Sequence, residues 1–509
     1  MAKNIVLCSD GTGNSSIKGR GTNVFKLFEA VDLNEHRTNP GLDAQLAFYD
    51  DGVGTGGVLL KVIGGATGYG LRDNVKQLYR ELSRVYDAND NIFLFGFSRG
   101  AFTVRTLAGM IGQCGILQGE SFETARQLHE AVELAYAAYR ERYDSVLTHA
   151  IGRAIGQKPG TKMAALAKLP RHEGVKIRFI GVWDTVDSVG LPFALAGLAN
   201  RVIYQFKFPT QTLGSHIEHA YHALSIDDPR VAFAPVLWGG PDSRIHQVWF
   251  SGVHSNVGGG YPKQGMSLVA LDWMLAHAER TGLRLQKTDV AVVRSHASVD
   301  DTLYDPCAGM GMFYRWAPRD VRDYCDRSKC APIIHLSVAE RIAHGTADYA
   351  PGNIPPDVKV VATPVDSTDP ECEYKERMLG QRSETVERAI NRALAGKYLL
   401  DKVRRSLAGA EASYWLLMAS WACLLAGAMN VAIRAARGSS LNVWSVEMVL
   451  AAGLLGLTLA SAGATRAHRR MSDRFSLFWQ RNQKHLRAAL KRAKADAQRA
   501  PAETTRTAA

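Results

Sequence analysis

The run Ile92-Phe93-Leu94-Phe95-Gly96-Phe97-Ser98-Arg99-Gly100 decides the fold of this chain. Its first six residues are apolar without alternation and too few for a stable helix, which predicts a buried strand. Residues 96–100 match the pattern G-x-S-x-G in the strand-to-helix setting that a nucleophile elbow requires, although an ordinary glycine-rich turn is the alternative. We therefore expect Ser98 to be a nucleophile at the start of a helix. That helix is indicated by apolar residues at helical spacing: Ala101, Val104, Ala108 and Ile111.

A serine hydroxyl is a weak nucleophile unless a base takes its proton and a carboxylate orients that base. In this architecture the acid and then the histidine follow the serine, each at the end of a later strand. Residues 177–183 form an apolar run that ends in Asp184, and residues 248–253 form another that ends in His254. The order predicts a triad of Ser98, Asp184 and His254, with Asp187 as the fallback acid.

Two backbone N–H groups near Ser98 are expected to stabilise a developing oxyanion. The first is that of Arg99, at the positive end of the following helix. The second is expected from the turn Asp10-Gly11-Thr12, because small residues let the backbone approach a substrate. The predicted oxyanion hole is thus Arg99, Gly11 and Thr12, while Asp10 alternatively hydrogen-bonds that loop into shape.

Working outward, strands alternate with amphipathic helices over the first 395 residues. Residues 4–8 read as a buried parallel strand, and residues 71–85 repeat apolar side chains on one helical face. This alternation predicts an α/β fold, a mostly parallel α/β-hydrolase-like sheet covered on both faces. Residues 118–170 and 187–246 are predicted to be insertions over the carboxyl edge of the sheet, where open α/β folds bind ligands and where a lid can form.

The far end of the chain predicts a transmembrane helical hairpin. Residues 414–433 carry no charge, and a helix of that length spans the roughly 30 Å hydrocarbon core of a bilayer. Residues 443–464 form a second apolar stretch with one acid, Glu447. A buried hairpin of a soluble domain is the alternative. Basic residues flank both outer ends, so the positive-inside rule puts the large N-terminal body on the cytoplasmic side.

These stretches divide the chain into a catalytic domain (1–395), a membrane hairpin (396–470) and a basic tail (471–509). Of the net charge of +12, residues 466–509 contribute +9, from 12 Lys and Arg against 3 Asp and Glu. The basicity therefore belongs to the tail, which is expected to lie on an anionic leaflet or in solvent rather than on nucleic acid. No cleavable export signal opens the chain, so we expect the body to stay in the cytoplasm unless a dedicated secretion machine carries it.

Neither a cofactor nor a metal is expected. The glycine-dense residues 52–57 and 64–70 do not match a P-loop. The three histidines His216, His219 and His222 lack a recognised zinc-ligand order, and Cys325 and Cys330 have no second pair.

Six blocks of the chain resemble the type VI secretion phospholipase-effector-like α/β hydrolases, a bacterial family of mostly uncharacterised members. The blocks are GFSRGA, GVWDTV, FSGVHSNVGGGY, Asp10-Gly11-Thr12, residues 49–55 and residues 222–225. The resemblance covers roughly residues 1–395. It implies a Ser-Asp-His esterase fold that acts on phospholipid-like esters, with Ser98, Asp184 and His254 at the matching positions.

The sequence as a whole predicts a membrane-anchored serine hydrolase that cleaves carboxylic ester bonds of lipids, with phospholipids favoured. Three alternatives remain open. One is an esterase, thioesterase or amidase for a soluble substrate, and another is a catalytically silent scaffold. The third is a secreted antibacterial effector whose hairpin inserts into a target membrane and which is paired with an immunity protein.

Overall fold

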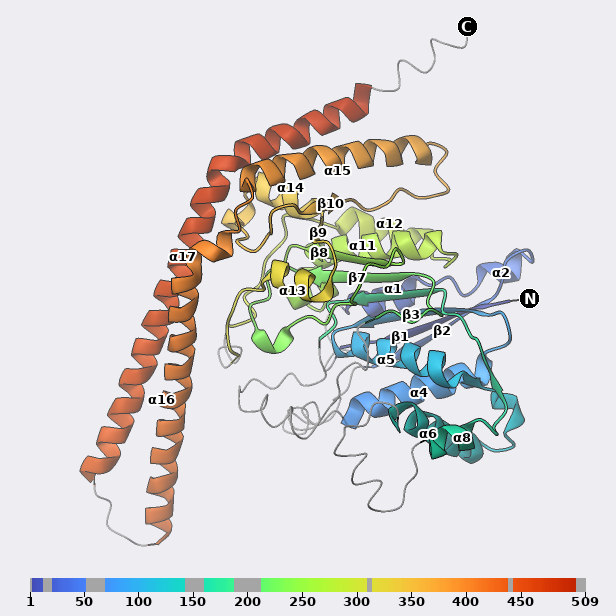
Figure 1. The fold of residues 1–509 in the computed structure, drawn as a ribbon, viewed down its shortest axis with the longest axis horizontal. Coiled ribbons are helices and arrows are strands. Elements are labelled where there is room, and N and C mark those ends of the chain that lie inside the picture. Colours follow the sequence, from blue (N-terminus) through green and yellow to red (C-terminus); the bar gives the residue numbers. More distant parts are fainter. Residues whose placement is uncertain are drawn as a thin grey trace.

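The protein is described by a computed structural model for residues 2–11, 21–51, 69–141, 160–186, 212–308, 314–437 and 443–499. Within these residues the central feature is an eight-stranded sheet in the order β10-β9-β8-β7-β6-β3-β1-β2 (Figure 1). Every pairing in it is parallel, which confirms the predicted parallel α/β sheet. The strands are β1 (Asn4–Ser9), β2 (Gln45–Asp50), β3 (Asn91–Phe97), β6 (Phe179–Trp183), β7 (Ala220–Ser225), β8 (Ile245–Phe250), β9 (Ile333–His335) and β10 (Lys359–Val361).

Helices cover both faces of the sheet, as parallel strands require. Successive residues of one strand point to opposite layers, so Ile5 and Leu7 pack with α4, α5 and α6, while Val6 and Cys8 pack with α1, α11 and α12. The sheet core is thus two apolar layers, one under each set of helices, and Figure 1 shows these helices on either side of the strands. The bounds are α1 (Asn23–Ala30), α4 (Tyr69–Val85), α5 (Arg99–Cys114), α6 (Ala125–Glu141), α11 (Gly265–Arg280) and α12 (Lys287–His296).

Two sequence expectations about strands are wrong in detail. The strand predicted at residues 248–253 lies at Ile245–Phe250, because the chain turns at Gly252, whose φ is +114°. The segment 187–246, predicted to be an insertion, contains the central strand β7, whose six residues are all buried. The sequence did not reveal this strand because a histidine, His222, interrupts its apolar pattern. In the structure His222 is buried, and hydrogen bonds to Thr185 and Gln247 satisfy its ring nitrogens.

The first predicted insertion, residues 118–170, is largely helical where it is described, with α6 and the short helix α8 (Thr161–Leu166) packed together. Residues 142–159 of this insertion and residues 187–211 of the second lie outside the described residues.

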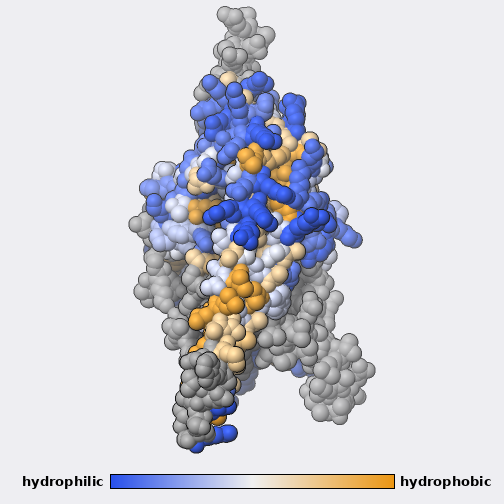
Figure 2. Space-filling view, turned by 90° about the vertical axis from the view of Figure 1, so that its left-hand side faces the viewer, coloured by the Kyte–Doolittle hydropathy of each residue, from blue (hydrophilic) through white to orange (hydrophobic). Residues whose placement is uncertain are grey.

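A long helical hairpin leaves the body, formed by α16 (Arg404–Ala436) and α17 (Val443–Arg499) (Figure 1). Both helices are long and apolar enough to cross a membrane by length and composition. Large apolar side chains on them are exposed, including Leu425 (66% exposed), Met429 (63%) and Leu455 (61%). The hairpin is therefore not buried within the described part of the body. Figure 2 shows its apolar patch beside the hydrophilic surface of the body.

The second half of α17 packs on the body. The helix runs unbroken through residue 470, where the basic tail was expected to begin, and Trp479 and Leu486 are buried in a cluster with α14 (Leu336–His344) and α15 (Cys372–Leu394). The Trp479 Nε1–H donates to the Pro351 carbonyl oxygen (2.7 Å), and Gln483 Nε2 donates to the Ile342 carbonyl oxygen (2.8 Å). A helix end leaves its last carbonyls without intrahelical partners, and α17 supplies donors to those of α14. These apolar residues face protein rather than a leaflet or solvent.

We predict that Trp479→Ala lowers the free energy of unfolding by about 3–5 kcal/mol, because it removes a buried indole and leaves a cavity. Thermal unfolding of the full chain in detergent measures this effect. The matched control is Leu477→Ala on the same helix, where the side chain is 54% exposed and the loss should stay within about 0.5 kcal/mol. Equal losses in the two variants would contradict the docking of α17.

Candidate active site

Ser98 occupies the sharp turn between β3 and α5. Its φ of +59° and ψ of −121° lie in a region that non-glycine residues rarely adopt, at a cost of about 1–3 kcal/mol. The two flanking glycines make this turn sterically possible. A Cβ at Gly96 would lie 2.5 Å from the Gly100 carbonyl oxygen, and a Cβ at Gly100 would lie 2.0 Å from the Ser9 carbonyl oxygen. The geometry is that of a nucleophile elbow.

Asp184 follows β6, the neighbour of β3 in the sheet, and its side chain is fully buried. Phe97 and Trp183 are register partners, and the Ser98 N–H donates to the Trp183 carbonyl oxygen (3.0 Å). Ser98 and Asp184 therefore start from adjacent positions on the carboxyl edge of the sheet. Ser225, at the end of β7, donates its N–H to Asp184 Oδ1 (3.0 Å) and its hydroxyl to Oδ2 (3.2 Å).

His254 begins the short helix α10 (His254–Gly258), four residues beyond the end of β8. The turn between them is held by Asp227, which accepts from the Gly252 N–H (2.6 Å), and by Asp228, which accepts from the His254 N–H (3.1 Å). The imidazole lies against the rings of Phe97 (centroids 4.6 Å apart) and Phe233 (5.0 Å). This turn places the histidine over the end of β7, next to Asp184.

The structure brings His254 and Asp184 into direct contact, with Nδ1 2.6 Å from Oδ2. A carboxylate only accepts hydrogen bonds, so Nδ1 carries the proton and Nε2 presents its lone pair. Nε2 is buried and has no hydrogen-bond partner among the described residues, so it is not bonded to the Ser98 hydroxyl. Burial lowers the pKa of His254, although Asp184 opposes that shift. The imidazole is therefore neutral at neutral pH.

Arg319, which the sequence analysis missed, completes the surroundings of Asp184. Its two terminal nitrogens bind the carboxylate side-on, Nη1 to Oδ1 at 2.6 Å and Nη2 to Oδ2 at 2.9 Å, and also donate to the carbonyls of Ser225 and Phe233. Burial opposes ionisation of Asp184, but the Arg319 charge and the His254 hydrogen bond outweigh it and hold the pKa of the carboxyl well below its usual range. Asp184 is thus ionised at neutral pH.

Of the three predicted oxyanion donors, the structure describes Arg99 and Gly11. Arg99 provides the first backbone N–H of α5, directly after Ser98. The Gly11 N–H donates to Asp10 Oδ1 (2.6 Å), and Asp10 Oδ2 accepts from the hydroxyls of Thr22 and Tyr49 (2.6 Å each). Asp10 therefore hydrogen-bonds the loop after β1.

Several residues singled out in the sequence lie outside the described residues. They are Thr12, the fallback acid Asp187, and the glycine-dense residues 52–57 and 64–68.

Two of the three histidines weighed as metal ligands, His216 and His222, have structural partners. His222 is fully buried and its Nε2 accepts from the Thr185 N–H (3.1 Å), which holds the segment after Asp184. His216 Nε2 lies 2.9 Å from the Ala108 carbonyl oxygen. Within the described part of the chain, no group of three or more His, Cys, Asp or Glu side chains could hold a metal ion.

Comparisons with known proteins give two matches. Residues 3–277, just over half of the chain, match the family described as "T6SS, Phospholipase effector Tle1-like, catalytic domain". A protein of Saccharomyces cerevisiae, "Uncharacterized protein YEL023C", is 30% identical over 247 residues, which are 45% of this chain and 32% of the yeast protein. The match therefore spans about a third of the yeast relative. No solved structure matches the chain.

We predict that Arg319→Met destabilises the fold by about 3–5 kcal/mol, because it leaves the Asp184 carboxylate buried without its charge partner. The control is Arg322→Met, three residues along, where the pair with Asp401 is exposed and worth at most about 1 kcal/mol. Asp184 has a depressed folded pKa, so its stabilisation is present above the unfolded value near 3.8 and is lost as pH falls through the folded value. Removing Arg319 raises the folded pKa of Asp184, so denaturation from pH 7 to pH 3 should show the stability gap between Arg319→Met and wild type narrowing as the carboxylate is protonated.

Proposed function

The chain belongs to the family of type VI secretion, Tle1-like phospholipase effector catalytic domains, and on that premise we propose that it is a serine hydrolase of membrane lipid esters. The observation that carries the proposal is the 2.6 Å contact between His254 Nδ1 and Asp184 Oδ2, which leaves Nε2 without a hydrogen-bond partner among the described residues, on a ring that packs against Phe97, the residue before Ser98. A base held in this way keeps one acceptor nitrogen for the serine hydroxyl and is oriented by a carboxylate that is ionised at neutral pH.

In the proposed mechanism, Nε2 of His254 takes the Ser98 hydroxyl proton as Oγ attacks the ester carbonyl carbon. Asp184 stabilises the imidazolium that forms, and Arg319 keeps Asp184 ionised. When the tetrahedral intermediate collapses, His254 returns the proton to the leaving alcohol and an acyl-Ser98 ester remains. A water molecule activated by His254 then releases the carboxylic acid and restores Ser98. The Ser98 to Nε2 hydrogen bond would close on substrate binding, since such bonds are often long in free enzymes.

The oxyanion would accept from the Arg99 N–H, at the positive end of the 16-residue helix α5. We propose the Gly11-Thr12 loop as the source of the second donor. For the Gly11 N–H to bind the oxyanion, its hydrogen bond to Asp10 Oδ1 must first break. Asp10 then acts as a positioning residue for the loop, through Thr22 and Tyr49.

A lipid substrate is supported by the hairpin as well as by the family. We propose that residues 396–470 cross a bilayer and return, so that the catalytic domain (1–395) and residues 471–509 lie on the same side. The packing of Trp479 and Leu486 on the body supports this arrangement, because it requires both outer ends of the hairpin to meet the body. The basic residues at those ends favour the cytoplasmic side.

The family description also favours a second role, that of a secreted effector delivered into a competing cell. Its activity would then be toxic and would be neutralised in the producing cell by an immunity protein. Expression of the chain in a sensitive bacterium, with and without Ser98→Ala, tests this role. Growth arrest by wild type alone is the expected result for an effector, and equal growth of both strains would argue against it.

We predict that a fluorophosphonate probe labels the purified protein in detergent and that both Ser98→Ala and His254→Ala abolish labelling. Loss of one triad member lowers turnover by about 10⁴-fold or more, because the hydroxyl is then absent or not activated. Ser255→Ala, next to His254 but outside the proposed triad, is the matched control and should label normally. A wild-type protein that is folded but never labelled would refute the assignment of Ser98 as nucleophile.

We predict that the acid limb of the kcat/KM profile lies below pH 6.5, because the base acts in its neutral form and burial lowers the pKa of His254. Arg230 also lowers this pKa, while its ion-pair partner Asp228 raises it. Arg230→Gln removes the positive charge that lowers the pKa of His254 and leaves the negative charge of Asp228, which raises it. The acid limb should therefore move to higher pH. A limb that stays in place or moves to lower pH would contradict this assignment of the base.

A further inference from the structure

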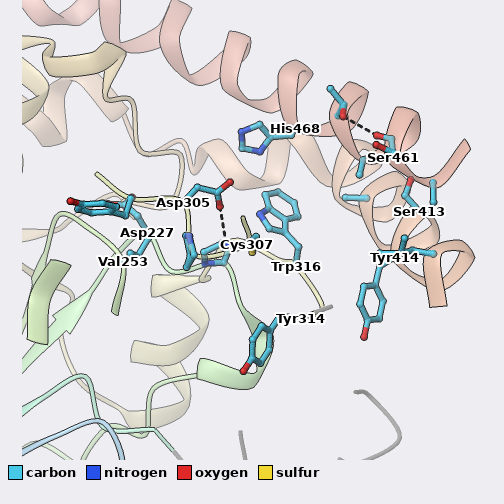
Figure 3. A pocket seen from close by; sticks show the side chains of 18 of the residues that line it. Asp227, Val253, Asp305, Cys307, Tyr314, Trp316, Ser413, Tyr414, Ser461 and His468 are labelled. Carbon is cyan, nitrogen blue, oxygen red and sulfur yellow. Dashed lines mark hydrogen bonds between the residues drawn. The ribbon is translucent and has the colours of Figure 1, made fainter. Parts of the chain in front are cut away.

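A cavity of about 640 Å³ lies where the hairpin meets the body. We call it the hairpin cavity. Its body wall includes Val253, Tyr314 and Trp316, and its hairpin wall includes Tyr414 of α16 and Ala464 of α17. Figure 3 shows side chains of the two walls facing each other across the space. Its volume falls within the roughly 300–1,000 Å³ of pockets that bind small molecules.

The body wall of the hairpin cavity leads to the candidate active site. Val253 immediately precedes His254. The Tyr314 ring packs edge-on against Phe233, with centroids 5.5 Å apart, and Phe233 packs edge-on against His254 at 5.0 Å. Only two aromatic contacts therefore separate the cavity from the proposed base.

Four of the polar side chains that line the hairpin cavity make hydrogen bonds within the protein. The Ser413 hydroxyl donates to the Gly409 carbonyl oxygen and the Thr465 hydroxyl donates to the Ser461 carbonyl oxygen, both at 2.8 Å within their own helices. On the body side, the Asp305 carboxylate accepts from the Cys307 N–H (2.8 Å).

The Asp227 carboxylate is also occupied, by the Gly252 N–H (2.6 Å) and the Tyr349 hydroxyl (2.8 Å). Because these hydrogen bonds are made within the protein, the four side chains need no polar partner from a ligand. The remaining lining surface is mainly apolar.

The hairpin wall continues into the surface that the proposed function places in a bilayer. Leu417, which lines the cavity, and Leu425 lie on α16 two turns apart, and Leu425 is 66% exposed. On α17, Ala460 and Ala464 line the cavity, and Leu455 on the membrane side of them is 61% exposed. An apolar chain could therefore pass from the bilayer along the helices into the cavity without crossing water.

We propose that the hairpin cavity binds one acyl chain of a membrane lipid and so presents its ester to Ser98 and His254. This inference rests on the proposed function and adds to it the place where an acyl chain of the substrate binds. The hairpin is then part of the substrate site as well as an anchor.

The first experiment fills the cavity. Ala464→Trp places an indole into it, whereas Ala462→Trp changes an exposed residue of the same helix that is not among the cavity-lining residues. Hydrolysis of p-nitrophenyl butyrate and p-nitrophenyl palmitate by full-length protein in detergent is compared. We expect Ala464→Trp to lose about 10-fold or more in kcat/KM on the palmitate, the factor that corresponds to about two buried methylenes, and to keep its rate on the butyrate.

Ala462→Trp should match wild type on both esters. Unchanged palmitate hydrolysis in Ala464→Trp, or equal losses on both esters, would overturn the inference. Failure of wild type to hydrolyse either ester would instead count against the proposed function.

The second experiment reads binding without turnover. Ser98→Ala protein is reconstituted in phosphatidylethanolamine and phosphatidylglycerol vesicles with a phosphatidylethanolamine that carries a diazirine near the end of one acyl chain. After photolysis, mass spectrometry should find crosslinks on body residues of the cavity, Tyr314 or Trp316, and Ala464→Trp should reduce them. Crosslinks confined to exposed hairpin residues such as Leu425 would overturn the inference even if the protein proves to be a lipid esterase.

Discussion

The Asp184 carboxylate is the point on which the candidate site depends. It is fully buried, so its charge must be compensated by the protein, and three segments from distant parts of the chain converge to do so. Arg319 arrives from the segment before α13 (Val321–Ser328), Ser225 from the end of β7, and His254 from the start of α10. A buried ion pair adds little to stability compared with apolar packing, yet breaking one is costly. Such a cluster therefore fixes which loops meet at the carboxyl edge of the sheet.

Ser98 imposes the complementary constraint, because a strained turn persists only where its surroundings determine it. The Gly100 Cα–H side faces the Ser9 carbonyl oxygen so closely that any side chain there would collide with β1. β1 lies beside β3, whose other neighbour β6 carries Asp184. The parallel sheet thus holds the elbow and the acid in adjacent strands, and the histidine reaches them from β8 only through the turn at Gly252. The order of the strands, more than any local sequence, sets the spacing of the three residues.

The sequence predicts those features that depend on local patterns. The strand-to-helix turn at Ser98, the parallel sheet and the two apolar helices each leave a periodic signal within about 20 residues. Arg319 leaves none, because it lies 135 residues from Asp184 and nothing in its neighbourhood marks it as buried. β7 was not predicted because the polar residue His222 interrupts its apolar run. The pairing of His254 with Asp184 was expected from chain order. The turn at Gly252 that positions His254 was not, because it is held by Asp227 and Asp228, which follow a different strand, β7.

The continuity of α17 explains how the hairpin can form one wall of the proposed acyl-chain cavity. A helix is stiff along its axis, and this one is fixed to the body by Trp479 and Gln483 on one side of the hairpin while its earlier turns pair with α16. The start of α16 is held in turn by Leu400 and Val403, which are buried in one cluster with Met471 of α17, and Trp316 of the cavity wall packs against this cluster. Because both helices are anchored within a few turns of the cavity, their small residues face the body at a fixed distance. A flexible linker could not form a wall of the proposed acyl-chain cavity, whereas a rigidly attached hairpin can.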